Sequence, residues 1–171
     1  MKGFLLLLVI PFLAGCGSAG ESGRALAVNN FEGMDGWTSV DYLTKERAHS
    51  GQFAARVDGS IEYAANYSNS LGRLSAEPIS KLDITAWVYR TDRTSMASLI
   101  VEAKDPATQQ NLLYKGIELA PLAKNLNEWT RVQHRLELPP TVNPATVLKI
   151  YLWRTGQAPV YLDDFEISQP H

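Results

Sequence analysis

The sequence predicts an all-β fold in which two antiparallel sheets pack face to face as a β-sandwich of the jelly-roll type. Short apolar runs alternate with polar residues at a period of two, as in strands with one buried face. No segment keeps a period of 3.6 residues for longer than a turn or two, and proline or glycine turns separate the runs. With 171 residues, 45% of them hydrophobic, the chain is long enough for one core between two sheets.

Five segments carry the alternation most clearly and are expected to be strands: 81–90, 98–103, 130–138, 147–154 and 160–168. In two of them, aliphatic side chains fall on one face and polar or aromatic side chains on the other. Their aliphatic faces comprise Leu82, Ile84, Ala86, Val88, Leu148, Ile150 and Leu152. At this spacing we expect eight or more strands in the whole domain.

The N-terminal segment 1–15 has the pattern of a signal peptide, with Lys2 before an apolar run too short to span a bilayer. It ends in Leu13-Ala14-Gly15-Cys16, which resembles a bacterial lipobox, and Cys16 is the only cysteine in the chain. The resemblance implies cleavage before Cys16 and lipid attachment to it. Because Gly17 is not an aspartate, the resemblance also implies the outer membrane. A secretory peptide with a chance cysteine is the alternative.

Composition excludes several classes of function for the rest of the chain. Residues 16–25 are mostly small and polar and are expected to be a flexible tether, and 26–171 to be one domain. A net charge of −2 without a basic run argues against a nucleic-acid partner. One cysteine cannot form an internal disulfide, and no Cys/His cluster has zinc spacing.

Four short motifs occur in order along the domain: Asn30-Phe31-Glu32-Gly33, Gly36-Trp37, His49-Ser50-Gly51 and Tyr161-Leu162-Asp163-Asp164-Phe165. Their order and spacing resemble jelly-roll carbohydrate-binding modules and, more broadly, the galactose-binding-like superfamily. The resemblance implies a structural calcium ion that ties the first strand, a turn and the last strand together. The implied ligands are Glu32, Ser50 or Gly51, and Asp163, with Asp164 beside it. Carboxylates exposed at a strand end are the alternative.

The adjacent aspartates also interrupt the alternation of the last strand. Leu162 and Phe165 cannot share a face in a regular strand, because side chains alternate with a period of two. A β-bulge or a metal ion at Asp163-Asp164 would explain the interruption.

The aromatic residues opposite the aliphatic faces are the candidate binding residues. We expect Trp87, Tyr89, Tyr151 and Trp153, with Arg131, to lie on an outer sheet face and to bind a glycan there. Flat rings stack on the apolar faces of sugars, and nearby polar side chains can hydrogen-bond the hydroxyls. The alternative is that these rings are core or contact a protein partner. Trp37 and Trp129 are expected to be structural.

The sequence contains no recognised catalytic motif, and we expect no enzyme activity. A small polysaccharide lyase is an alternative, because such enzymes use residue types that are present here: Gln133, His134, Arg135 and Tyr151. It is the less favoured one. Gln133 and His134 would point to opposite faces of one strand, which argues against a shared groove. The sequence therefore predicts a noncatalytic, glycan-binding lipoprotein of the cell envelope. A structural or protein-interaction lipoprotein without a sugar ligand is the alternative.

Overall fold

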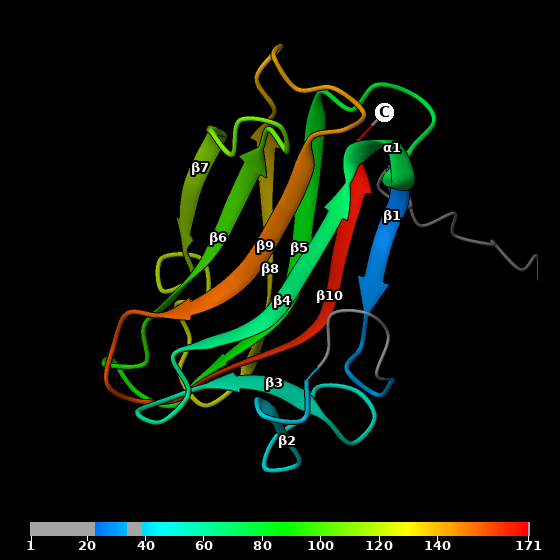
Figure 1. The fold of residues 1–171 in the computed structure, drawn as a ribbon. Helices are drawn as coiled ribbons and strands as arrows, with labels where there is room; N and C mark the ends of the chain where they lie inside the picture. The colour runs from blue at the N-terminus through cyan, green and yellow to red at the C-terminus, as the bar shows by residue number, and fades with distance from the viewer. Residues whose placement is uncertain (1–22, 34–38, 171) are drawn as a thin grey trace, which may run out of the picture.

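The structure, a computed structural model, describes residues 23–33 and 39–170. In these ranges ten strands form two sheets packed face to face, and one short helix follows β4 (Figure 1). Their bounds are β1 Arg24–Asn29, β2 Leu43–Thr44, β3 Ala54–Val57, β4 Tyr63–Ser70, α1 Leu71–Leu74, β5 Lys81–Arg90, β6 Ala97–Lys104, β7 Asn111–Glu118, β8 Trp129–Glu137, β9 Val147–Arg154 and β10 Val160–Gln169. The predicted all-β sandwich is confirmed. No helix of the described ranges is long and apolar enough to cross a membrane.

The two sheets differ in size. The large sheet has six strands, in the order β2-β3-β10-β5-β8 with β1 also paired to β10, and the small sheet has the order β4-β9-β6-β7. Every strand pair is antiparallel. β10 pairs with β3 through 160–162 and with β1 through 165–169, so β1 continues the edge that β3 begins. β2 and β3 lie at one end of the sandwich and α1 at the other (Figure 1).

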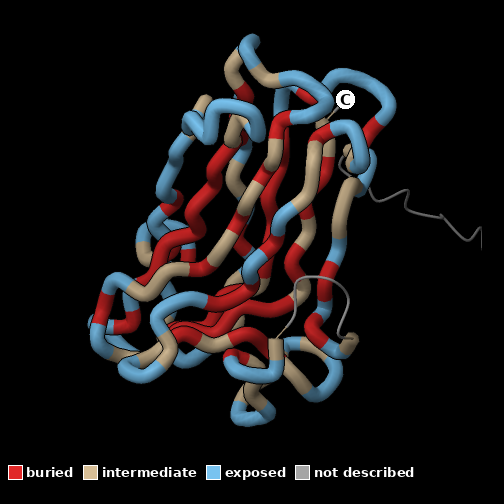
Figure 2. Tube along the Cα trace, viewed as in Figure 1, coloured by how far each residue is buried: buried red, intermediate tan, exposed pale blue. Residues whose placement is uncertain are grey.

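The core lies between the sheets and is built from the aliphatic faces that the alternation predicted. Buried positions run along the strands, whereas the turns are largely exposed (Figure 2). The buried set includes Leu82, Ile84, Ala86, Val88, Leu99, Val101, Leu148, Ile150 and Leu152. Because these side chains pack against one another across the two sheets, the aromatic residues that alternate with them on β5 and β9 point to the outer faces.

β10 contains the bulge that the adjacent aspartates predicted. Its register with β5 shifts between Asp163 and Glu166, and Asp164 has a positive φ of 44°. The extra residue returns the next side chain to the core, so Leu162 and Phe165 are both buried. A second bulge lies in β4 at Ala65, which has a φ of 53°.

The described part begins close to the predicted domain boundary. β1 starts at Arg24, which pairs with Gln169, two residues before the expected start of the domain. Cys16 and most of the predicted tether lie outside the described residues, as do Gly36 and Trp37.

Candidate functional site

The four aromatic residues predicted to share one face lie on two different faces. Trp87 and Tyr89 belong to β5 in the large sheet, whereas Tyr151 and Trp153 belong to β9 in the small sheet. Both pairs point away from the core, and the two sheets lie back to back between them. A single groove lined by all four rings is therefore wrong, and each outer face has to be considered by itself.

On the large sheet, the segment 45–53 covers the aromatic pair. The His49 ring stacks on Trp87 with centroids 3.8 Å apart and planes at 15°. The Arg47 guanidinium lies 4.5 Å from the centre of the Tyr89 ring, and only 7% of Tyr89 is exposed. Arg131 is exposed on β8 and is the strand partner of Trp87. Because other side chains already lie against both rings, this pair has little ring surface left for a sugar.

Two carboxylates hold this segment against the sheet. Asp163 Oδ2 accepts hydrogen bonds from the backbone N–H groups of His49 and Ser50 at 2.7 and 3.1 Å. Glu32 Oε1 accepts the N–H groups of residues 52 and 53 at 2.8 and 2.7 Å. The clamp turns the chain at Gly51, whose φ of +57° favours glycine. Burial raises the pKa of Asp163, although the backbone N–H groups of Ser50, Asp164 and His49 favour its charged form.

The residues implied as calcium ligands thus come together, but their carboxylate oxygen atoms already accept hydrogen bonds from the protein. Asp164 accepts from the Ser50 hydroxyl at 2.6 Å and lies 2.6 Å from His49 Nδ1, in addition to the Asp163 and Glu32 contacts. Among the residues that the structure describes, no group of three or more His, Cys, Asp or Glu side chains could hold a metal ion. These carboxylates form a hydrogen-bonded clamp, and calcium would need six to eight oxygen ligands, backbone carbonyl groups included. Calcium binding stays a prediction.

The small sheet carries the more open aromatic group. Tyr63 on β4 lies 5.9 Å from Tyr151, edge to face, and 6.5 Å from Trp153 with the rings nearly parallel at 11°. Tyr63 is 47% exposed, and the rings of β9 are partly exposed. A hollow of about 490 Å³ opens beside them, lined by Tyr63, Asn66, Tyr67, Ser68, Lys149 and Tyr151. Open rings beside polar side chains are the arrangement that a sugar site requires.

A buried carboxylate fixes the floor of this face. Glu102 on β6 is only 9% exposed, accepts the Tyr151 hydroxyl at 2.9 Å and lies 3.6 Å from Lys104 Nζ. Burial, followed by the hydrogen bond to this carboxylate, raises the pKa of Tyr151 well above its usual value. The Trp153 indole N–H donates to Glu62 at 3.2 Å. These contacts fix the orientation of both rings, so the face is organised before a ligand arrives.

Tyr63 and Tyr114 also belong to this face, and the sequence alone did not decide whether they lie in loops or line a site. Tyr63 is in β4 and Tyr114 is in β7, opposite Glu102 and 55% exposed. The polar composition of β4 and the bulge at Ala65 hide its alternation. The available signal was Tyr-Ala-Ala-Asn-Tyr at 63–67, which keeps apolar residues on both sides of the bulge.

The residues considered for a lyase do not converge. His134 and its neighbours Gln133 and Arg135 belong to β8 in the large sheet, and Tyr151 belongs to β9 in the small sheet. His134 is half-buried on the core side, between Val132 and Leu136. Arg135 forms a two-point contact with Asp83, at 2.7 and 2.6 Å. The residues considered for a lyase therefore lie on separate sheets and do not form one site.

Solved structures of carbohydrate-binding modules share this fold. The first family 22 module of Paenibacillus barcinonensis Xyn10C, a xylan-binding domain, is 20% identical with a TM-score of 0.56, over 88% of this chain and 97% of that domain. The C-terminal family 22 module of Clostridium thermocellum Xyn10B is 12% identical with a TM-score of 0.57, over 85% and 93%. A family 16 carbohydrate-binding module is 17% identical with a TM-score of 0.53, over 80% and 92%. No protein-family model and no curated protein matches the chain. The chain has the β-sandwich fold of these carbohydrate-binding modules.

Proposed function

We propose that this protein is a noncatalytic carbohydrate-binding domain and that it binds a glycan chain across the outer face of the small sheet. The observation that carries the proposal is the group formed by the exposed Tyr63 ring and the half-buried Tyr151 and Trp153 rings, beside the hollow of about 490 Å³. Sugar rings present flat C–H faces that stack on such side chains. The xylan-binding modules that share the fold support a polysaccharide ligand.

The floor of the same face supplies the polar contacts. Lys149 and Tyr114 flank the Glu102 carboxylate on the neighbouring strands, and Asn66 and Ser68 line the hollow on β4. Together they offer donors and acceptors for sugar hydroxyl groups. The carboxylate already accepts a hydroxyl and lies near an ammonium group, so it acts as a fixed acceptor, which suits binding without catalysis.

Glycan binding is tested by isothermal titration with soluble xylan and a panel of other polysaccharides, in the presence of calcium and of a chelator. We expect Trp153→Ala to weaken binding about tenfold or more, because truncating a central aromatic contact costs about 2 kcal/mol and each 1.4 kcal/mol is about tenfold. Trp87→Ala is the matched control, since Trp87 lies on the opposite outer face under His49. If Trp87→Ala abolishes binding and a folded Trp153→Ala does not, the assignment to the small sheet is wrong. If the wild type binds no glycan, a structural or protein-interaction role replaces the proposal.

We also propose that the domain is anchored to the outer membrane through a lipid on Cys16. The lipobox-like sequence before this cysteine supports the proposal. Metabolic labelling with a fatty acid should mark the wild type and not Cys16→Ser, and the variant should leave the membrane fraction. Equal labelling of both proteins would contradict the anchor.

A further inference from the structure

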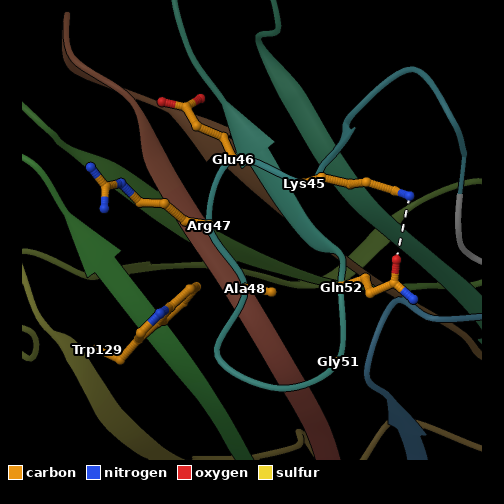
Figure 3. Close-up of a pocket in the computed structure, with 7 residues that line it drawn as sticks. All are labelled: Lys45, Glu46, Arg47, Ala48, Gly51, Gln52 and Trp129. Atoms are coloured by element: carbon orange, nitrogen blue, oxygen red, sulfur yellow. Dashed lines mark hydrogen bonds between the residues drawn. The ribbon is translucent and has the colours of Figure 1, made fainter.

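A second hollow lies on the opposite outer face, where the segment 45–52 runs beside the start of β8. Its volume is about 520 Å³, and it is lined by Lys45, Glu46, Arg47, Ala48, Gly51, Gln52 and Trp129 (Figure 3). None of these residues belongs to the glycan face of the small sheet. The hollow combines positive charge with an aromatic ring, whereas the small-sheet hollow combines neutral polar groups, one lysine and rings.

The positive charges of this hollow have no acidic partner among the described residues. Arg47 and Lys45 form no ion pair there, whereas the Glu46 carboxylate pairs with Arg56 at 3.1 Å. Figure 3 shows the Glu46 carboxylate pointing away from Trp129. The hollow is therefore lined by two cations without an ion pair among the described residues and by one carboxylate that pairs with Arg56.

Arg47 is held in place although it lacks an ion pair. Its guanidinium lies 4.5 Å from the Tyr89 ring centre and 6.0 Å from that of Tyr161. Its Nε is buried and has no hydrogen-bond partner in the described structure. A guanidinium stacked by its face keeps its N–H edge for an acceptor, and a buried donor without an acceptor is costly. Arg47 as a whole is only partly buried, so the outer N–H groups of its guanidinium, rather than Nε, are the donors that face an anionic oxygen.

Trp129 supplies an aromatic surface next to this position. Its ring meets Tyr89 and His49 at steep angles, 64° at 5.5 Å and 73° at 5.7 Å, and it stays half-exposed. Figure 3 places Trp129 and Arg47 on the same side of the loop, and Lys45 and Gln52 on the other. The loop backbone cannot easily withdraw, because the Glu32 and Asp163 clamp holds its N–H groups.

We propose that this hollow is a second saccharide site, which takes a sugar residue that carries a carboxylate. Arg47 binds the carboxylate through its N–H edge, and Trp129 packs against the sugar ring. This site goes beyond the proposed small-sheet groove and does not depend on it. An anionic membrane surface is less suited, because membranes attract protruding basic clusters, whereas Arg47 lies flat against two rings.

The test uses the full chain labelled with ¹⁵N at its indole groups, titrated with trigalacturonate and with its neutral methyl ester. The chain has four tryptophans, so each site has its own reporter: Trp129 for this hollow and Trp153 for the small sheet. We expect the acid, and not the ester, to shift the Trp129 indole resonance. Arg47→Gln should weaken trigalacturonate binding at least tenfold, because a charge-assisted contact is lost.

Controls separate this proposal from the proposed function. Arg73→Gln removes an exposed positive charge on α1, at the opposite end of the sandwich (Figure 1), and should change nothing. Trp153→Ala should weaken neutral glycan binding about tenfold or more and leave trigalacturonate binding intact. If Arg47→Gln fails to fold, Arg47→Lys tests the same contact, since it keeps the charge and loses the planar edge. Binding should weaken for that variant too.

Three outcomes would overturn the second site. Equal affinity for trigalacturonate and its methyl ester would show that Arg47 does not bind the carboxylate of the sugar. A shift of Trp153 alone would place trigalacturonate on the small sheet. Binding that depends on Arg47 to phosphatidylglycerol vesicles, without any trigalacturonate binding, would make the hollow a membrane contact.

Discussion

Replacing Gly51 with alanine tests the carboxylate clamp that holds the segment 45–53. Gly51 has a φ of +57°, and a Cβ added there would lie 2.5 Å from Glu32 Oε1 and overlap the carboxyl carbon. The same oxygen accepts the backbone N–H groups of residues 52 and 53. The substitution therefore strains the backbone and also expels the Glu32 carboxylate from the clamp.

The expected cost follows from these two effects. A left-handed conformation costs a non-glycine residue about 1–2 kcal/mol. Glu32 is exposed, so each of its two hydrogen bonds contributes only about 0.5–1 kcal/mol. The free energy of unfolding should fall by about 2–4 kcal/mol in total. For a domain of this size the midpoint temperature should fall by about 5–15 °C.

Urea denaturation followed by tryptophan fluorescence measures this cost, with Gly59→Ala as the matched control. A Cβ at Gly59 meets nothing within 4 Å, so that variant should stay within about 0.5 kcal/mol of the wild type. Adding Glu32→Ala to Gly51→Ala should cost less than the sum of the two single changes, because both remove the same contacts. If Gly51→Ala and Gly59→Ala are equally stable, the Glu32 clamp contributes nothing and the reasoning fails.

Three further changes test other contacts. Hydrogen bonding to Arg135 lowers the pKa of Asp83 in the folded state below its value in the unfolded state. As the pH falls, the unfolded state therefore binds a proton at this carboxyl before the folded state does, and stability is lost. Between pH 5 and pH 2 the wild type should lose about 1 kcal/mol more stability than Asp83→Asn in urea titrations, and equal losses would argue against the pair. Tyr151→Phe should cost about 1–2 kcal/mol in the same assay, since Glu102 loses its hydroxyl donor, and an unchanged midpoint would contradict that role. Gly116 lies on β7 two residues from Tyr114, so the side chain of Gly116→Leu should block glycan binding in the titration. The melting temperature should stay nearly constant, because a Cβ there meets only one side-chain atom, at 3.5 Å. Undiminished binding would exclude this part of β7 from the groove.

The core faces and five of the ten described strands could be predicted from the sequence, because they depend on local alternation. The five predicted segments correspond to β5, β6, β8, β9 and β10 within two residues at each end. The bulge at Asp163-Asp164 was also predictable, since only an extra residue lets Leu162 and Phe165 both reach the core. β4 and β7 were missed because a bulge or exposed polar residues obscure the period of two.

The sharing of a face between distant strands could not be predicted, because pairing is nonlocal. The segments of β5 and β9 have the same pattern of aliphatic and aromatic residues, yet β5 pairs with β10 and β8, and β9 with β4 and β6. Alternation states that a side chain points outward, and it does not state from which sheet. For this reason the sequence predicted one groove, whereas the four rings lie on the outer faces of two different sheets.

The two outer faces also show why an outward aromatic residue is not by itself a binding residue. Trp87 and Trp153 occupy equivalent positions in the alternation, but a stacked histidine lies 3.8 Å from the first and a parallel, exposed tyrosine 6.5 Å from the second. The difference arises from the carboxylates of Glu32 and Asp163, which draw the segment 45–53 over the large sheet. These two acidic residues therefore cover the rings of β5 and, through the same hydrogen bonds, present Arg47 and Trp129 at a new surface. The position of a loop, set by residues far away in the sequence, thus determines which rings of the sandwich are available to a ligand.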